Sequence, residues 1–214
     1  MTGLEAIVGD RTRVMIRQQK EWGEILLGFE SKNRFELSDD EGQRLGLAAE
    51  ESSGFGAMFA RNFLGKCRKA TIHIYDDAGN RVGRGEKPFS WFFHRMEVYD
   101  GTKKIGAIQR KWSWVSRKFA IENEAGREVM QIYSPIFRIW TFKLMLEDQE
   151  VGRISKKWGG MLKEMFTDAD VFGMEVDETV PNELRAILLV ATFLIDFTCF
   201  ENNSKSGSGL SLLD

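Results

Sequence analysis

Residues 186–200 are almost wholly apolar, and this segment limits what the chain can fold into more than any other feature. Pro181 and the acidic Glu183 precede it, which is typical of the first turn of a helix. A helix over these residues would carry one narrow polar stripe, made of Arg185, Thr192, Asp196 and Cys199. Every other side of it would have to be covered by protein or by lipid.

Protein and lipid make different demands on the length of such a helix. Its fifteen residues would span about 22 Å, whereas the hydrocarbon core of a bilayer is roughly 30 Å thick. Asp196, near the end of the segment, would also be costly in lipid. We therefore expect a helix that is enclosed in the protein and includes Leu188, Phe193, Asp196 and Phe197, with a membrane-inserted helix as the alternative.

The chain from residue 34 to about residue 155 alternates short strand patterns with turns rich in Asp, Asn and Gly. Residues 71–75 and 81–83, for example, flank the turn at 76–80, and further turns fall at 100–101 and 124–126. Turns this regular predict a mainly β protein with antiparallel strands. About twelve strands and one apolar helix together predict a closed antiparallel β-barrel that encloses the C-terminal helix. Such a barrel would also give much of the aromatic content, 12% of the residues, a buried place.

An internal repeat lies within this pattern. Gly106-Ala-Ile-Gln-Arg-Lys-Trp112 matches Gly152-Arg-Ile-Ser-Lys-Lys-Trp158, and each copy follows a predicted hairpin turn. One hairpin-and-strand unit used twice accounts for the match. Both copies carry a basic pair before the tryptophan, and on paired strands these four residues would form one patch flanked by indoles, suited to anionic lipid headgroups: Arg110, Lys111, Lys156 and Lys157. The alternative is a solvated strand face with each tryptophan packed in the core.

A second apolar run, Phe89-Ser-Trp-Phe-Phe93, is too short to span a bilayer. It is also very apolar for an exposed loop. We expect it to be a buried strand of the barrel, with a membrane-facing segment as the alternative.

The segment before the last predicted strand is the best metal candidate. Asp168 and Asp170 stand two residues apart with Gly173 after them, as at the start of a calcium loop. The full EF-hand pattern fails because Thr179 occupies the position of the final bidentate acid. With Asp177 as a third ligand, these residues predict a calcium site. A solvated turn is the alternative.

Composition excludes several function classes. A formal net charge of -2 gives no reason to expect nucleic-acid binding. Two cysteines, Cys67 and Cys199, cannot make a disulfide framework, and no signal peptide is visible, so we expect a protein that faces the cytosol. With only two histidines and no nucleophile–base pair, an enzyme is not expected.

No linker divides residues 1–201, which we expect to be one domain, and the Ser/Gly-rich residues 202–214 are expected to form a mobile tail.

Several of these segments resemble the phospholipid scramblase family. The resemblance covers about residues 4–201, and the motifs that carry it are Gly28-Phe-Glu30, Asn33, Gly42-Gln-Arg44, Ala48-Ala-Glu50, Val151 to Trp158, Phe166-Thr-Asp-Ala-Asp170, Ala191 to Phe197, and Phe200-Glu201. The wider superfamily includes Tubby-like and LURP-one-related proteins. The resemblance implies a twelve-stranded barrel of the Tubby C-terminal type around a central C-terminal helix.

The resemblance also implies a function. The family is credited with calcium-stimulated, ATP-independent, bidirectional movement of phospholipids between membrane leaflets. Its proposed calcium segment aligns with residues 168–179, so Asp168 and Asp170 carry over, and its proposed membrane helix aligns with residues 186–200. We therefore expect anionic phospholipid membranes as the partner, at the inner, cytoplasmic face. The alternative is a Tubby-like scaffold that binds lipid headgroups or proteins without transport. The oligomeric state stays open.

Overall fold

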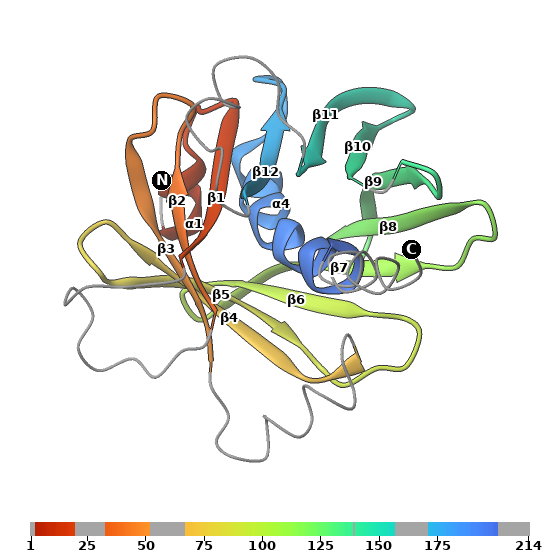
Figure 1. Cartoon of the computed structure of the whole chain (residues 1–214), viewed down its shortest axis with the longest axis horizontal. Coiled ribbons are helices and arrows are strands. Elements are labelled where there is room, and N and C mark those ends of the chain that lie inside the picture. The colour runs from red at the N-terminus through yellow and green to blue at the C-terminus, as the bar shows by residue number, and fades with distance from the viewer. Residues whose placement is uncertain (1–2, 20–32, 52–66, 139, 157–170, 201–214) are drawn as a thin grey trace, which may run out of the picture.

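Twelve strands of the computed structural model form a closed antiparallel barrel around a helix (Figure 1). The structure describes residues 3–19, 33–51, 67–138, 140–156 and 171–200. Each strand pairs with its neighbours along the chain, and β1 closes the ring against β12. The strands are β1 (Arg13–Gln19), β2 (Arg34–Ser38), β3 (Arg44–Glu50), β4 (Ala70–Asp76), β5 (Arg81–Lys87), β6 (Arg95–Asp100), β7 (Lys103–Lys111), β8 (Ser116–Asn123), β9 (Glu128–Pro135), β10 (Thr141–Leu146), β11 (Gln149–Ser155) and β12 (Val171–Val176). The barrel fold predicted from the sequence is confirmed. The tail predicted at residues 202–214 lies outside the described residues.

The apolar C-terminal segment lies inside this barrel. It forms α4 (Asn182–Ile195) and a π-helical turn, η2 (Asp196–Phe200), and every residue from Arg185 to Ile195 is buried. Leu188 and Phe193 are fully buried, and Asp196 and Phe197 are at most 5% exposed. The prediction of an enclosed helix is thus confirmed. Within the part of the chain that the structure describes, no helix has the length and apolar character needed to cross a membrane.

The strands of the barrel wall pack closely against α4. Phe193 on the helix meets Phe35 of β2 and Phe172 of β12 edge to face, with ring centroids 5.2 Å and 5.9 Å away. On the opposite side, a Cβ atom at Gly106 of β7 would lie 2.6 Å from Ile187 Cδ1 and 2.4 Å from the Glu122 carbonyl oxygen. Glycine at residue 106 therefore lets the strand approach both the helix and its neighbouring strand.

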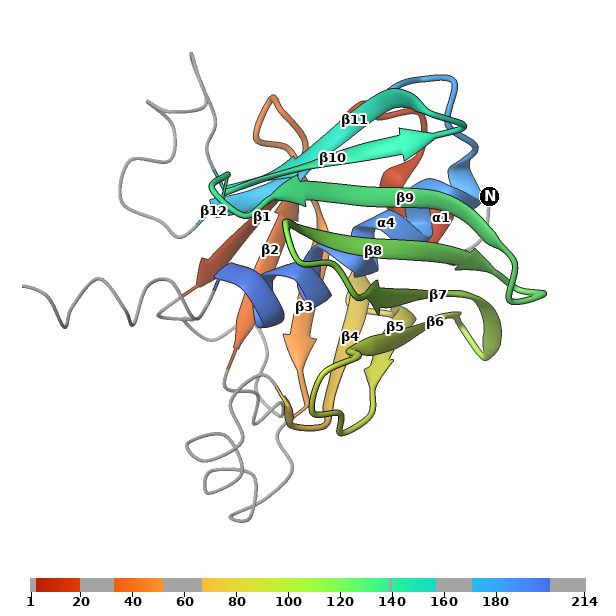
Figure 2. The same cartoon turned by 90° about the vertical axis from the view of Figure 1, so that its right-hand side faces the viewer.

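The two ends of the barrel differ (Figure 2). Short hairpin turns join β2–β3, β4–β5, β6–β7, β8–β9 and β10–β11, and in an up-and-down barrel these turns share one end, which we name the turn end. The other connections share the opposite end, which we name the loop end. Helix α4 starts at the turn end beside α1 (Gly3–Val8) and finishes at the loop end.

The internal repeat has a structural counterpart. Its copies form β7 and β11, each the second strand of a hairpin, and in both hairpins the register shifts next to the repeated glycine, Gly106 or Gly152. The prediction of one hairpin unit used twice is therefore confirmed. The two copies do not pair, as one shared basic patch would require, because β8, β9 and β10 lie between them in the barrel.

Candidate functional site

The polar stripe of α4 is satisfied inside the barrel. The Arg185 side chain, 2% exposed, donates to four backbone carbonyls: Nε to Val180 at 2.8 Å, Nη1 to Gly9 at 3.1 Å and to Arg11 at 3.3 Å, and Nη2 to Asp177 at 2.9 Å. These contacts join the start of α4 to the segment after α1 and to the turn after β12. Because a buried guanidinium is tolerated only when its donors are paired, this network holds the helix in place at the turn end.

Buried ion pairs surround the other end of the helix. Asp196 Oδ1 lies 3.4 Å from Lys156 Nζ, and the two side chains are 7% and 9% exposed. The Lys156 ammonium also lies 5.9 Å from the centre of the Phe172 ring. Lys156 is therefore part of the interior at the loop end. The prediction that it joins Arg110 and Lys111 in one exposed basic patch is wrong for these described residues, since their strands are not neighbours and Asp196 draws Lys156 inward. Lys157 lies outside the described residues.

A second pair lies beside the same helix end. Arg68 Nη1 is paired with Glu50 Oε1, and Asn33 Nδ2 donates to Glu50 Oε2 at 2.6 Å. The Arg68 guanidinium carbon is 5.6 Å from the centre of the Phe197 ring. Sequence reasoning did not identify this cluster, because its residues are far apart in the chain and meet only when β3 and β4 pair at the loop end.

Exposed apolar side chains gather on three connections at the loop end. They come from the β5–β6, β7–β8 and β9–β10 connections, and we name them the aromatic rim: Phe89, Trp91, Phe92, Phe93, Trp112, Trp114, Val115, Ile136 and Phe137. Phe92, Trp114, Val115 and Phe137 are between 76% and 82% exposed. Within the described residues, every exposed large hydrophobic side chain belongs to this rim.

The prediction of a buried strand at residues 89–93 is therefore wrong. Strand β5 ends at Lys87, and Pro88 lacks the backbone N–H that would continue the ladder. The chain then forms a loop whose base is fixed by His94, which is fully buried and lies 2.9 Å (Nδ1) from Ser90 Oγ. The residues of the rim that sequence reasoning missed are Trp114, Val115, Ile136 and Phe137, and their signal was an apolar run with no acidic residue between two predicted strands.

Backbone hydrogen bonds join the three connections. The Arg110 N–H donates to the His94 carbonyl at 2.8 Å, and the Ile136 N–H donates to the Val115 carbonyl at 3.4 Å. Within the loops, the Phe89 and Trp91 rings lie 5.2 Å apart and the Trp112 and Trp114 rings lie 4.7 Å apart, both edge to face. The rim is thus one connected surface with ring pairs that hold each other in position.

Basic residues lie at the base of the rim. Arg110 and Lys111 end β7, directly before Trp112, and together with Ser113 and Ser116 they line a cavity of about 230 Å³ that Trp91 also lines. Lys111 Nζ is 3.5 Å from a carboxylate oxygen of Glu128, and both side chains are more than a third exposed. Because exposed pairs at this distance are weak, Lys111 can exchange this partner for another anion.

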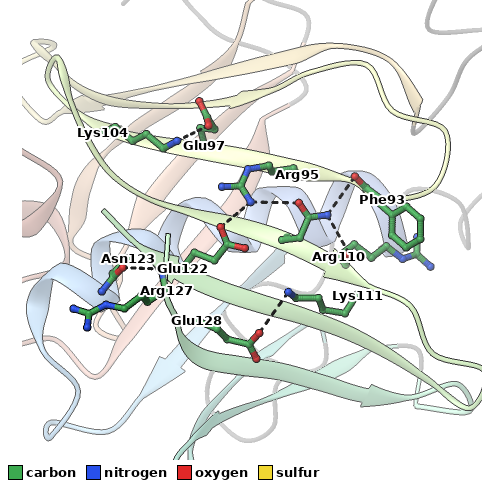
Figure 3. Close-up of polar contacts among 11 residues, drawn as sticks. Phe93, Arg95, Glu97, Lys104, Arg110, Lys111, Glu122, Asn123, Arg127 and Glu128 are labelled. Atoms are coloured by element: carbon green, nitrogen blue, oxygen red, sulfur yellow. Dashed lines mark hydrogen bonds and ion pairs between the residues drawn. The ribbon is translucent and has the colours of Figure 1, made fainter. Parts of the chain in front are cut away.

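A line of polar contacts supports the base of the rim (Figure 3). Glu122 Oε2 lies 2.7 Å from Arg95 Nη1, which donates to Gln109 Oε1 at 3.3 Å. Gln109 Nε2 donates in turn to the backbone carbonyls of Phe93 at 3.5 Å and Arg110 at 3.1 Å. One amide group therefore ties the β5–β6 loop to the end of β7, so that Phe93 and Arg110 are presented side by side.

Only one of the three predicted calcium ligands lies among the described residues. Asp168 and Asp170 lie outside them, and Asp177 is exposed in the turn after β12. Among the described residues, no three Asp, Glu, His or Cys side chains are grouped as metal ligands.

Comparison with known proteins gives one family. A model of the Scramblase family matches residues 2–202. The chain is 31% identical to phospholipid scramblase 1 of Rattus norvegicus, over 92% of this chain and 63% of the rat protein. It is 32% identical to phospholipid scramblase 2 of Bos taurus, over 88% of this chain and 68% of the bovine protein. The chain thus spans less than two thirds of the rat relative's length.

Two further proteins are similar to this chain, one in sequence and one in structure. Phospholipid scramblase family member 5 of Homo sapiens is 31% identical over 89% of this chain and 74% of its own length. A solved structure of an Arabidopsis thaliana protein aligns with 89% of this chain and 96% of its own chain at a TM-score of 0.49 and 13% identity, which is too distant to add to the description of the fold.

Proposed function

This chain belongs to the Scramblase family, and from that premise we propose that it acts on phospholipid membranes and moves phospholipids between their two leaflets without ATP. The observation that carries the proposal is the family match over residues 2–202, supported by relatives at about 31% identity that are named phospholipid scramblases. We further propose that the protein works at the cytoplasmic face of a membrane that contains anionic lipid.

A transport assay tests this proposal. The purified chain is reconstituted into vesicles that carry a fluorescent phospholipid in both leaflets, and dithionite is added outside. In protein-free vesicles only the outer half of the fluorescence is lost. Loss well beyond that half, without ATP, is the expected result for the protein. Loss that stops at the outer half would contradict transport.

Calcium stimulation is proposed as a separate property. Asp168 and Asp170 are the acids that match the family's calcium segment, and Asp177 is the third predicted ligand. The same assay with and without calcium should show stimulation that Asp168→Asn with Asp170→Asn abolishes. An equal calcium response in the double variant would contradict the assignment of these two carboxylates.

A membrane-binding scaffold without transport is the second candidate function. The enclosed helix favours it, because Arg185 and Asp196 hold both ends of α4 inside the barrel by buried polar contacts. The two candidates differ in one result: a scaffold binds vesicles and leaves the inner leaflet protected from dithionite.

A further inference from the structure

We propose that the aromatic rim is the surface on which this protein docks to a phospholipid bilayer, its rings entering the interfacial layer and its arginines and lysines meeting anionic headgroups. The inference rests on the proposed membrane function and adds to it the surface and the orientation. Four features of the described residues carry it: the location of the exposed rings, their residue types, the charges around them and the cavity at their base.

The first feature is the concentration of exposed apolar side chains. Single exposed apolar residues are ordinary on a protein surface, whereas a contiguous exposed patch marks an interaction site. In the described residues all nine exposed large hydrophobic side chains lie on three connections at one end of the barrel, and seven of them are more than half exposed. Their loops are joined by the backbone hydrogen bonds at His94 and Val115, so the patch is continuous.

The second feature is the type of residue. Tryptophan and phenylalanine on protruding loops, next to lysine and arginine, are typical of segments that lie in the membrane interface. Two of the connections carry tryptophans with strongly exposed rings, Trp91 between β5 and β6, and Trp112 and Trp114 between β7 and β8. Tryptophan favours the headgroup level of a bilayer, because its ring is apolar and its N–H still reaches a polar group.

The third feature is the sign of the charge. Residues 88–94, 110–118 and 135–138 contain five basic side chains, and no aspartate or glutamate occurs in these ranges: Arg110, Lys111, Arg117, Lys118 and Arg138. Protein partners and further copies of this chain would also accept an apolar patch. Within these three ranges the charge is positive, which is complementary to the uniform negative charge that an anionic leaflet offers.

The fourth feature is the cavity between the β5–β6 and β7–β8 connections. Arg110, Lys111, Ser113 and Ser116 line its volume of about 230 Å³ with cationic and hydroxyl donors, and Trp91 and Trp112 border it with rings. Donors below a ring of aromatic residues match a phospholipid whose phosphate lies at the base and whose glycerol region lies between the rings. The cavity therefore gives the basic residues a position at headgroup depth.

The test measures binding of the full chain to vesicles of phosphatidylcholine with and without phosphatidylserine. One variant, Trp114→Ser with Phe137→Ser, removes apolar rings. A second variant, Arg110→Gln with Lys111→Gln, removes charge. The matched control, Lys103→Gln with Arg127→Gln, removes the same charge from exposed residues at the turn end. All the substituted side chains are at least partly exposed, so the thermal unfolding temperature should stay unchanged. This temperature is measured for every variant.

We expect the ring variant to bind anionic vesicles at least about tenfold more weakly than the natural chain, and the charge variant about tenfold more weakly at low salt. The control should stay within about twofold. The charge variant should lose its difference from the natural chain as salt is raised, while the ring variant should keep it.

Unchanged vesicle binding by both variants would overturn the inference. Loss of self-association in the ring variant, with vesicle binding unchanged, would assign the rim to a second copy of the chain and also overturn it. The transport assay separates this inference from the proposed function. If the natural chain binds through the rim and does not scramble, transport fails and the docking surface stands. If both variants bind and scramble like the natural chain, the docking surface fails and transport stands.

Discussion

At the scale of single residues, Arg185 is the side chain that commits α4 to the inside of the barrel. It donates to four carbonyls from two segments of the chain, and no carboxylate is among these partners. Arg185→Met would keep much of the volume and leave several buried carbonyls without a donor. We expect a loss of roughly 3 kcal/mol or more in the free energy of unfolding, measured by urea denaturation.

Arg127→Met is the matched control for this change. Arg127 lies exposed in the β8–β9 turn, and its substitution should alter the free energy of unfolding by less than about 0.5 kcal/mol. An equal loss in the two variants would show that the buried network has no special part in stability.

Lys87 gives the protein a stability that depends on pH. Its side chain is 2% exposed, and burial lowers the pKa of its ammonium group to about 8, while Nζ donates to the Arg68 carbonyl at 2.7 Å. The unfolded chain, where the pKa is near 10.5, holds this proton longer as pH rises. Unfolding therefore becomes less favourable between pH 7.5 and 9.5, by about 1 to 2 kcal/mol. Urea denaturation at both pH values measures the rise, and a flat profile in the natural chain would contradict it.

The variant Lys87→Met assigns this pH dependence. It has no group that titrates at residue 87, so the rise between pH 7.5 and 9.5 should disappear. The pKa values of Tyr75 and Tyr99 are raised above 10, so these groups titrate mainly above this pH range in the folded protein. The main cause is burial for Tyr75 and the hydrogen bond to Glu97 for Tyr99.

At the scale of elements, the helix and the hairpins could be predicted from the sequence, and the rim could not. An apolar run of this length, with one polar stripe, favours an enclosed helix over a membrane-inserted one, and each hairpin has its own turn residues. Residues 89–93 have the same local pattern in a buried strand and in an exposed loop. Which one forms depends on where β5 stops pairing with β4. Likewise, the burial of Lys156 depends on Asp196, which the barrel brings near only after it closes.

The position of α4 in the presence of lipid is the prediction that belongs to this scale. Cys199, 6% exposed, lies in η2, and Cys67 is the other cysteine of the chain. In a Cys67→Ser variant, a water-soluble thiol reagent should modify Cys199 at least about a hundredfold more slowly in the folded protein than in urea. The protection should persist on anionic vesicles if the helix stays enclosed.

The variant Cys199→Ser provides the comparison, since its remaining thiol at Cys67 is partly exposed and should react quickly. Rapid modification of Cys199, or its transfer to a lipid-soluble reagent, once vesicles are added would mean that α4 leaves the barrel. Such a result would favour transport through a rearranged chain over the enclosed scaffold.

At the scale of the whole molecule, the described hairpin turns and the rim carry charges of opposite sign, although the formal net charge of the chain is only -2. Exposed acids collect in the hairpin turns and in the turn before α4, at Asp40, Glu41, Asp77, Glu124, Glu147, Asp148, Asp177 and Glu178, against the exposed Arg81, Lys103 and Arg127. Residues 88–94, 110–118 and 135–138, which make up the rim and the strand ends beside it, carry only basic charge. A molecule of this kind is repelled from an anionic surface in one orientation and attracted in the other, so net charge is a poor guide to its membrane binding.

This separation predicts a single orientation on the membrane, with the loop end in the interface and the turn end in water. Val115 in the β7–β8 connection and Ala125 in the β8–β9 turn are both exposed and lie at opposite ends of β8. Eight strand residues at the usual barrel tilt place them about 20 Å apart along the barrel axis, which is more than the depth of the interfacial layer.

Single fluorophores at Val115→Cys and Ala125→Cys, in a chain with Cys67 and Cys199 replaced by serine, measure this orientation. On anionic vesicles the label at residue 115 should shift its emission to shorter wavelength and be quenched by a lipid-borne quencher, while the label at residue 125 should stay open to iodide in water. Quenching of both labels by lipid would mean that the barrel lies flat or inserts whole. Quenching at residue 125 alone would show the opposite orientation. The acidic turns would then face the membrane instead of the water.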